Sequence, residues 1–384
     1  MTHRERFALA LEHKEADRVP IDLGSTWASS IQKNAYVEVL KYLGMDLPEP
    51  PIWHFMQQLS AIHEEFLKRF EIDVRGIHPD LATAGPEKTI QVKDTGDYWA
   101  YSDEWGLGWR MPKTGGFYYD MYQHPLVGAD IEQVRRYPLP DGGDPSRWAG
   151  LPEEGRRLAS EGFGTVLYTR VGAGLLETLL WLQGFEDGFV NLVANPELTE
   201  CLLDRILDLN IRFYSKMLAD VGDSPQVVAF GEDLGLQDRP MLSLEMFRRY
   251  LLPRYQALFT AIKAASPEIK ILFHTCGASA GFLPDLIESG VDVLNPVQVS
   301  AAGMDTKKLK KEFGGQLVFW GGIDTQHVLP RGTPADVRDE VRRRIDDLAP
   351  GGGFVLAAVH NIQSGVPPRN VVTMLETALE YGGY

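Results

Sequence analysis

The sequence predicts an α/β fold: a single (β/α)8 barrel of the TIM type with an irregular, aromatic-rich insertion after its second strand. Short, continuous apolar runs alternate with longer amphipathic stretches along the chain. This alternation is typical of parallel strands that are covered on both faces by helices. Eight such runs can be counted, and a length of 384 residues suits one barrel domain with insertions.

The predicted strands are defined by these apolar runs. They cover residues 19–23, 72–77, 165–171, 226–231, 269–274, 291–295, 316–321 and 353–360.

Helices between the strands begin at recognisable signals. Asn195 precedes Pro196, Ser243 precedes an amphipathic stretch, and Thr333 precedes Pro334. Short polar residues are preferred as helix N-caps, and proline is favoured in the first turn. A last helix over residues 368–381 would complete the outer ring of the barrel.

Residues 79–150 break this alternation, because aromatic residues, glycine and proline crowd together there. We therefore predict one barrel domain over residues 1–384 that contains an insertion at 79–150. Within it, residues 98–106 could form hairpins that cap the mouth of the barrel. A structural β-extension or a dimer surface is an equally good interpretation.

Composition excludes several classes of function. The formal net charge is −15, from 53 acidic and 38 basic residues, so a nucleic acid would find no basic surface. No apolar run approaches the roughly 18 residues of a membrane span, and the N-terminal residues show no signal-peptide pattern. We expect a cytoplasmic protein whose two cysteines, Cys201 and Cys276, are reduced.

A candidate metal site lies at the end of the predicted strand 269–274. His274 and Cys276 are separated by one residue, and alternate strand residues face the same side. A barrel carries its catalytic groups at this end of its strands. A catalytic zinc usually has three protein ligands, and His360, at the end of the last predicted strand, is the best third candidate. The alternative is a packed cysteine beside a hydrogen-bonded histidine.

Carboxylates follow two other strands. Glu232 and Asp233 come directly after residues 226–231, and only one of the two should face the mouth, because adjacent strand residues point in opposite directions. That carboxylate could bind metal, act as a base or orient a histidine, whereas Asp233 could equally cap a helix. Asp324 follows Gly321 and Gly322 and could line a substrate pocket.

Taken together, these motifs resemble the uroporphyrinogen decarboxylase superfamily, which also contains zinc-dependent, corrinoid-linked methyltransferases. The resemblance spans nearly the whole chain and is most specific in five segments. They are residues 231–235, 273–277, 298–305, 319–324 and 359–363. It implies a distorted (β/α)8 barrel, in agreement with the strand count.

The resemblance is closest to the methyltransferase branch. The decarboxylases carry an arginine-rich segment of the type Arg-Gln-Ala-Gly-Arg-Tyr just after the first strand, whose arginines bind the carboxylates of a tetrapyrrole. The corresponding residues 18–27 lack that segment. The methyltransferases hold zinc through a His-x-Cys pair, here His274 and Cys276, and a later ligand that is often cysteine. His360 stands near that position, and decarboxylases also have a histidine there. Glu232 is a candidate for an additional ligand.

The function implied is transfer of a methyl group between a small substrate, a methyl ether or a thiol, and a separate corrinoid protein that carries cobalamin. Zinc would act as a Lewis acid. Trp105 and its aromatic neighbours could give the substrate an apolar wall. Relatives often form homodimers. The alternatives are decarboxylation of a tetrapyrrole or other carboxylate, with Asp22 or Asp80 moving protons, and a non-catalytic homologue.

Overall fold

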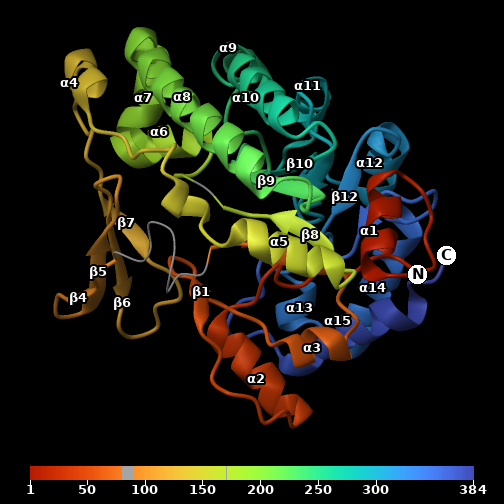
Figure 1. Ribbon diagram of the computed structural model, residues 1–384. Coiled ribbons are helices and arrows are strands. Elements are labelled where there is room, and N and C mark those ends of the chain that lie inside the picture. Colours follow the sequence, from red (N-terminus) through yellow and green to blue (C-terminus); the bar gives the residue numbers. More distant parts are fainter. Residues whose placement is uncertain (80–89, 170) are drawn as a thin grey trace.

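A curved sheet of seven parallel strands forms the centre of the protein (Figure 1). The structure is a computed structural model that describes residues 1–79, 90–169 and 171–384. The strand order is β13-β12-β11-β10-β9-β8-β3, so strands adjacent along the chain are neighbours in the sheet and the (β/α)8 prediction is confirmed. The strands are β3 (Val74–Ile77), β8 (Gly164–Leu167), β9 (Val227–Gly231), β10 (Lys270–His274), β11 (Val293–Asn295), β12 (Val318–Trp320) and β13 (Phe354–Val355).

The first predicted strand is present only as a bridging segment. The Asp22 N–H donates to Leu356 O and the Leu356 N–H donates to Pro20 O, each at 2.9 Å, while the Asp73 N–H donates to Ile21 O at 2.9 Å. Residues 20–22 therefore join the end of β13 to the start of β3 and occupy the eighth position of the barrel. Pro20 has no N–H to donate, which limits a regular ladder here.

The last predicted strand was too long. Regular pairing stops at Val355, and beyond it only isolated bridges join Leu356 to Ile21 and Ala358 to Ile323. His360 consequently lies in a bend that follows the strand rather than at the end of the strand itself.

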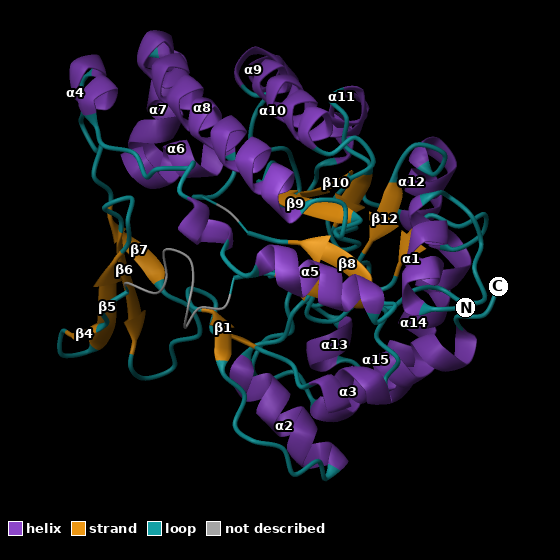
Figure 2. Cartoon of the chain, viewed as in Figure 1, coloured by secondary structure: helices purple, strands orange, loops and turns teal. Residues whose placement is uncertain are grey.

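Helices surround the strands (Figure 2). Ser243 and Thr333 cap their helices as predicted, since the Ser243 side chain accepts from the Met246 N–H and the Thr333 side chain from the Asp336 N–H. The predicted last helix coincides with α15. The helices outside the insertion are α1 (His3–Leu11), α2 (Lys33–Leu43), α3 (Glu64–Arg69), α5 (Leu151–Ser160), α6 (Leu175–Gln183), α7 (Phe185–Ala194), α8 (Pro196–Val221), α9 (Leu244–Tyr250), α10 (Leu252–Ala265), α11 (Leu283–Glu288), α12 (Thr306–Phe313), α13 (Val328–Arg331), α14 (Pro334–Leu348) and α15 (Pro368–Tyr381).

The region predicted as an insertion carries its own antiparallel sheet, which Figure 1 shows to one side of the barrel. A hairpin of β5 and β6 confirms the hairpin expected near residues 98–106. Two residues just before β7 join this region to the rest of the protein. The Tyr119 N–H donates to Met56 O, in the turn between β1 and β2, at 2.9 Å, and the Tyr118 hydroxyl donates to Asn361, after β13, at 2.8 Å. That residues 1–384 form one domain stays a prediction. The elements here are β4 (Lys93–Asp94), β5 (Tyr98–Ser102), β6 (Gly108–Pro112), β7 (Asp120–Gln123) and α4 (Ile131–Arg136). A separate two-stranded sheet of β1 (Ile52–His54) and β2 (Leu59–Ser60) precedes this region.

The N-terminal end of the barrel is closed by α1. Phe7 is fully buried and meets Trp320 edge to face, with ring centroids 5.3 Å apart. We therefore look for the active site at the opposite end of the barrel, where the strands end at their C-termini and polar residues cluster. Among the described residues, no helix is both long and apolar enough to cross a membrane.

Candidate active site

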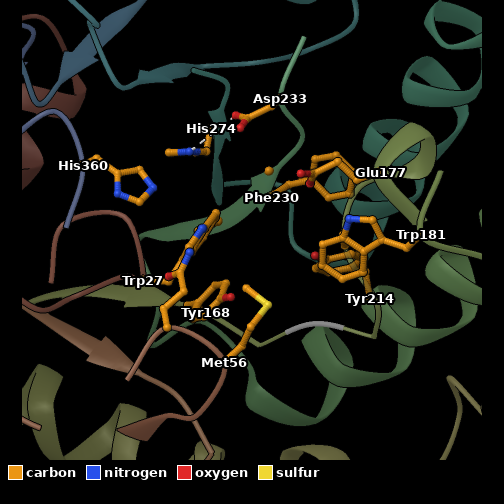
Figure 3. A pocket seen from close by; sticks show the side chains of 14 residues that line it. Trp27, Met56, Tyr168, Glu177, Trp181, Tyr214, Phe230, Asp233, His274 and His360 are labelled. Atoms are coloured by element: carbon orange, nitrogen blue, oxygen red, sulfur yellow. Dashed lines mark ion pairs between the residues drawn. The ribbon is translucent and has the colours of Figure 1, made fainter. Parts of the chain in front are cut away.

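The three residues predicted to bind metal come together at this end of the barrel. One ligand atom from each of His274, Cys276 and His360 lies within 4.8 Å of the others. The His274 Nε2 atom is 3.5 Å from Cys276 Sγ, and the centroids of the two histidine rings are 6.1 Å apart. Figure 3 shows both histidines at one side of a cavity. The sequence prediction of their proximity is thus confirmed, although their role as ligands stays a proposal.

The ring of His274 is held by a partner that the sequence reasoning missed. Its Nδ1 atom lies 2.6 Å from Asn295 Oδ1, and Asn295 Nδ2 donates to Trp320 O at 3.2 Å. The second bond fixes Asn295 with its oxygen toward the imidazole, so Nδ1 donates, and in the neutral form of this ring Nε2 carries the lone pair. That lone pair is on the side of Cys276. Asn295 ends β11 directly opposite His274 in the parallel ladder, which is the signal that could have found it.

The protonation states suit a metal site. Burial, followed by the neighbouring His274, lowers the pKa of His360 to about 4, so its imidazole is neutral and can act as a ligand. Burial raises the pKa of the Cys276 thiol well above its usual value, and the carboxylates of Asp233 and Glu177 raise it further. The thiol is therefore protonated in the metal-free protein, and a metal that ligates sulfur would displace this proton.

The carboxylate that faces the cavity is Asp233. Its Oδ1 atom lies 3.8 Å from His274 Nε2, accepts the Cys276 N–H at 2.8 Å, and its side chain is 40% exposed. Asp233 therefore links the end of β9 to the loop that carries Cys276. These partners lie at the end of β10 and in the loop after it, and neither is in the first turn of a helix. The contacts therefore do not support the alternative that Asp233 caps a helix.

Glu232 lies apart from His274, Cys276 and His360, which form the proposed metal group. This differs from our preference for Glu232 as an additional ligand. It is fully buried, its Oε1 accepts the Glu177 N–H at 2.7 Å, and Tyr255 donates its hydroxyl to Oε2. Burial, followed by the charge of Glu177, raises its pKa well above the usual value. Glu232 thus holds the first turn of α6 against β9, which fits the prediction that adjacent carboxylates point in opposite directions.

A cavity of about 90 Å³ lies beside the two histidines. Five aromatic rings line it, contributed by Trp27, Tyr168, Trp181, Tyr214 and Phe230. Sequence reasoning missed all five as site residues, because they come from loops, strand ends and helices that are far apart in the chain.

The two residues predicted to bind substrate do not line this cavity. Trp105 is buried within the hydrophobic core, although its neighbour Trp109 packs edge to face on Trp181 at 5.4 Å. Asp324 accepts the backbone N–H groups of Gln326 and His327 at 2.6 and 2.9 Å, so it stabilises a turn.

The aspartates weighed for decarboxylation are also accounted for. Asp22 is buried within the barrel and accepts the Trp320 Nε1–H at 3.0 Å. Burial raises its pKa to about 6. Asp80 lies outside the described residues.

A second cavity, of about 250 Å³, adjoins Cys276 and His360. It shares His360 with the first cavity and includes Cys276. Three glutamines give it a polar lining, and Gln298 Oε1 accepts the Gly277 N–H at 2.7 Å. The group of His274, Cys276 and His360 therefore borders both an aromatic cavity and an uncharged polar one.

Gly277 allows the chain to turn away immediately after Cys276. Its φ is +83°, and a Cβ atom there would lie 2.3 Å from the backbone of Gly235. We expect Gly277→Ala to lower the free energy of unfolding by at least about 1–3 kcal/mol and to weaken metal binding, measured by urea denaturation and zinc titration. Gly281→Ala is the control, because nothing lies within 4 Å of that position. Unchanged stability and zinc affinity in Gly277→Ala would contradict this account of the turn.

Comparison with known proteins identifies the class to which this fold and site belong. Residues 180–381 match the family model described as uroporphyrinogen decarboxylase (URO-D). This region covers more than half of the chain and contains every element of the metal group. The chain belongs to the uroporphyrinogen decarboxylase family.

Relatives in this family have different activities. The chain is 24% identical over 181 residues to a methylated-thiol–coenzyme M methyltransferase from Methanosarcina mazei, which covers 46% of the chain and 43% of that relative. It is 21% identical over 318 residues to a uroporphyrinogen decarboxylase from Alkalilimnicola ehrlichii, which covers 81% of the chain and 77% of that relative. The match thus spans less than half of the first relative's length.

A solved structure supports the fold over the whole chain. A methyltransferase from Methanosarcina mazei superposes with a TM-score of 0.65, covering 99% of each chain at 16% sequence identity. At this level of identity, the likeness shows the fold alone.

Proposed function

We propose that the protein is a zinc-dependent methyltransferase that moves a methyl group between a small substrate, a methyl ether or a thiol, and a corrinoid protein. The observation that carries the proposal is the group of His274, Cys276 and His360, which faces a small cavity at the C-terminal end of the barrel. Two imidazoles and one thiol are the donors that zinc prefers, and three protein ligands leave one position open for substrate.

His274, Cys276 and His360 would hold the zinc ion. The ion supplies Lewis acid chemistry, which lowers the pKa of a bound thiol or polarises the oxygen of a methyl ether. Asn295 keeps the Nε2 atom of His274 free to ligate, and Asp233 holds the loop of Cys276 through its backbone N–H. We assign Glu232 a positioning role, because its carboxylate fixes the start of α6 and with it Glu177 at the cavity.

The chemistry of the aromatic cavity argues against a tetrapyrrole substrate. Its charged lining includes Glu177 and Asp233, whereas a substrate with several carboxylates needs basic partners. The methyltransferase among the sequence relatives adds support.

The proposal is tested by supplying the zinc-loaded protein with reduced cobalamin, as a stand-in for the corrinoid protein, and with a panel of small methyl donors. We expect at least one donor to produce the visible spectrum of methylated cobalamin at least tenfold faster than the same mixture without enzyme. A decarboxylase would instead convert uroporphyrinogen to coproporphyrinogen. Formation of coproporphyrinogen without methyl transfer would overturn the proposal.

A further inference from the structure

The aromatic cavity combines two features that together select one class of ligand. Aromatic rings surround it, and the carboxylates of Glu177 and Asp233 are part of its lining. We infer that this cavity binds a small methylated cation, a quaternary ammonium or a sulfonium group, as part of the substrate. This inference rests on the proposed function and narrows its substrate class.

The rings are arranged as walls rather than as one stacked column. Trp27 stacks on Tyr168 with centroids 4.3 Å apart and lies 5.1 Å from the His274 ring. Trp181 lies on the opposite side of the cavity in Figure 3. Tyr214 is next to Phe230, with centroids 6.3 Å apart. A compact cation between such walls meets ring faces from several directions, and quaternary ammonium groups are recognised by aromatic cages of this kind.

The wall that holds Trp181 is itself fixed. Trp109 from β6 meets Trp181 edge to face, with centroids 5.4 Å apart. Phe230 and Tyr214 are nearly fully buried. Trp181, Tyr214 and Phe230 are therefore packed against neighbouring residues in the ligand-free protein, and less side-chain ordering on binding lowers its entropic cost.

The charge of the lining complements a cation. Glu177 lies in the first turn of α6 and Asp233 directly follows β9, and both side chains line the cavity. A neutral methyl ether of an aromatic ring would use the ring faces and would gain nothing from the carboxylates. A methylated cation uses both, because it cannot donate a strong hydrogen bond and is held by charge and by ring faces.

The inference is tested by calorimetric titration of the zinc-loaded protein with choline and with two analogues of the same shape. In the neutral analogue a tert-butyl group replaces the trimethylammonium group, and tert-butylacetate provides an anion. We expect choline to bind at least about tenfold more tightly than the neutral analogue. Equal binding of choline and the neutral analogue, or tighter binding of the anion, would overturn the inference.

A matched pair of variants tests the contribution of charge. Glu177→Gln keeps the shape of the side chain and should weaken choline binding several-fold while leaving the neutral analogue unaffected. Glu186→Gln, in the first turn of the adjacent helix α7 and exposed, should leave both ligands unaffected. Equal effects of the two substitutions on choline binding would count against a role for Glu177.

The zinc content of the same samples separates this inference from the proposed function. Stoichiometric zinc and methyl transfer from a neutral donor, without any preference for choline, would refute the cation site and leave the methyltransferase proposal standing. A clear preference for choline in protein that binds no zinc would support the cation site and refute the proposed zinc chemistry.

Discussion

The Cys276→Ala variant is expected to lose nearly all of its bound zinc while it keeps its fold. Cys276 supplies the one sulfur among three donors, and its loss leaves two imidazoles. Substituting a residue that only supports a metal ligand costs roughly 10–100-fold in affinity, so removal of a ligand should cost at least about 100-fold. Elemental analysis after dialysis measures the retained zinc, and circular dichroism checks the fold.

Cys201→Ala is the matched control, because Cys201 lies on α8 outside the metal group and is the only other cysteine of the chain. It should retain the zinc content of the wild type. Full zinc content in Cys276→Ala, or equal losses in the two variants, would show that Cys276 is not a ligand.

A second large effect is expected at the N-terminal end of the barrel, where Asp73→Asn should lower the free energy of unfolding by about 3–5 kcal/mol. Asp73 is fully buried. Its carboxylate forms ion pairs with Arg6 Nη1 at 2.6 Å and Arg18 Nη1 at 2.7 Å, and it accepts a hydrogen bond from the Ile21 N–H at 2.8 Å. An amide there leaves two arginines without their buried counter-charge. Urea denaturation at neutral pH measures the loss.

The same carboxylate makes stability depend on pH. Burial raises the pKa of Asp73, but its hydrogen bond with His3, the charge of Arg18, the Ile21 N–H and the charge of Arg6 outweigh burial and lower it overall. A lowered pKa means that the stabilisation is complete above the unfolded-state pKa of about 4 and is lost as the pH falls through the folded-state pKa. Asp73→Asn should remove this acid dependence.

Asp17→Asn is the control for both measurements at Asp73. Asp17 also pairs with Arg6, at 2.6 Å, but its side chain is 44% exposed. A pair that is open to solvent on one side contributes only about 0–1 kcal/mol. A loss at Asp17 as large as that at Asp73 would contradict the importance of the buried position.

The sequence was sufficient to predict the barrel because its apolar runs and helix signals are local. The start of α14 at Pro334 and the whole of α15 follow from such signals. Strand ends were predicted less well: β13 stops at Val355, although the apolar run continues to Val359. An apolar run shows that a segment is buried, but regular pairing also depends on where the neighbouring strand lies.

The metal group was predictable because two of its residues are separated by one position and the third follows the last apolar run. The rest of the site depends on contacts between distant segments. Sequence reasoning favoured Glu232 over Asp233, and the start of α6, which binds Glu232, lies 55 residues earlier in the chain. Trp27 and Trp181 likewise line one cavity although they are far apart in the sequence. No local sequence pattern predicts that they lie close together.

The zinc site is examined most sharply by X-ray absorption at the zinc edge of the purified protein. We expect one bound zinc with one sulfur at about 2.3 Å and at least two nitrogen ligands at about 2.0–2.1 Å, with the sulfur signal absent in any zinc retained by Cys276→Ala. A protein that takes up no zinc, or a zinc ion bound only by oxygen and nitrogen in the wild type, would rule out His274, Cys276 and His360 as its ligands.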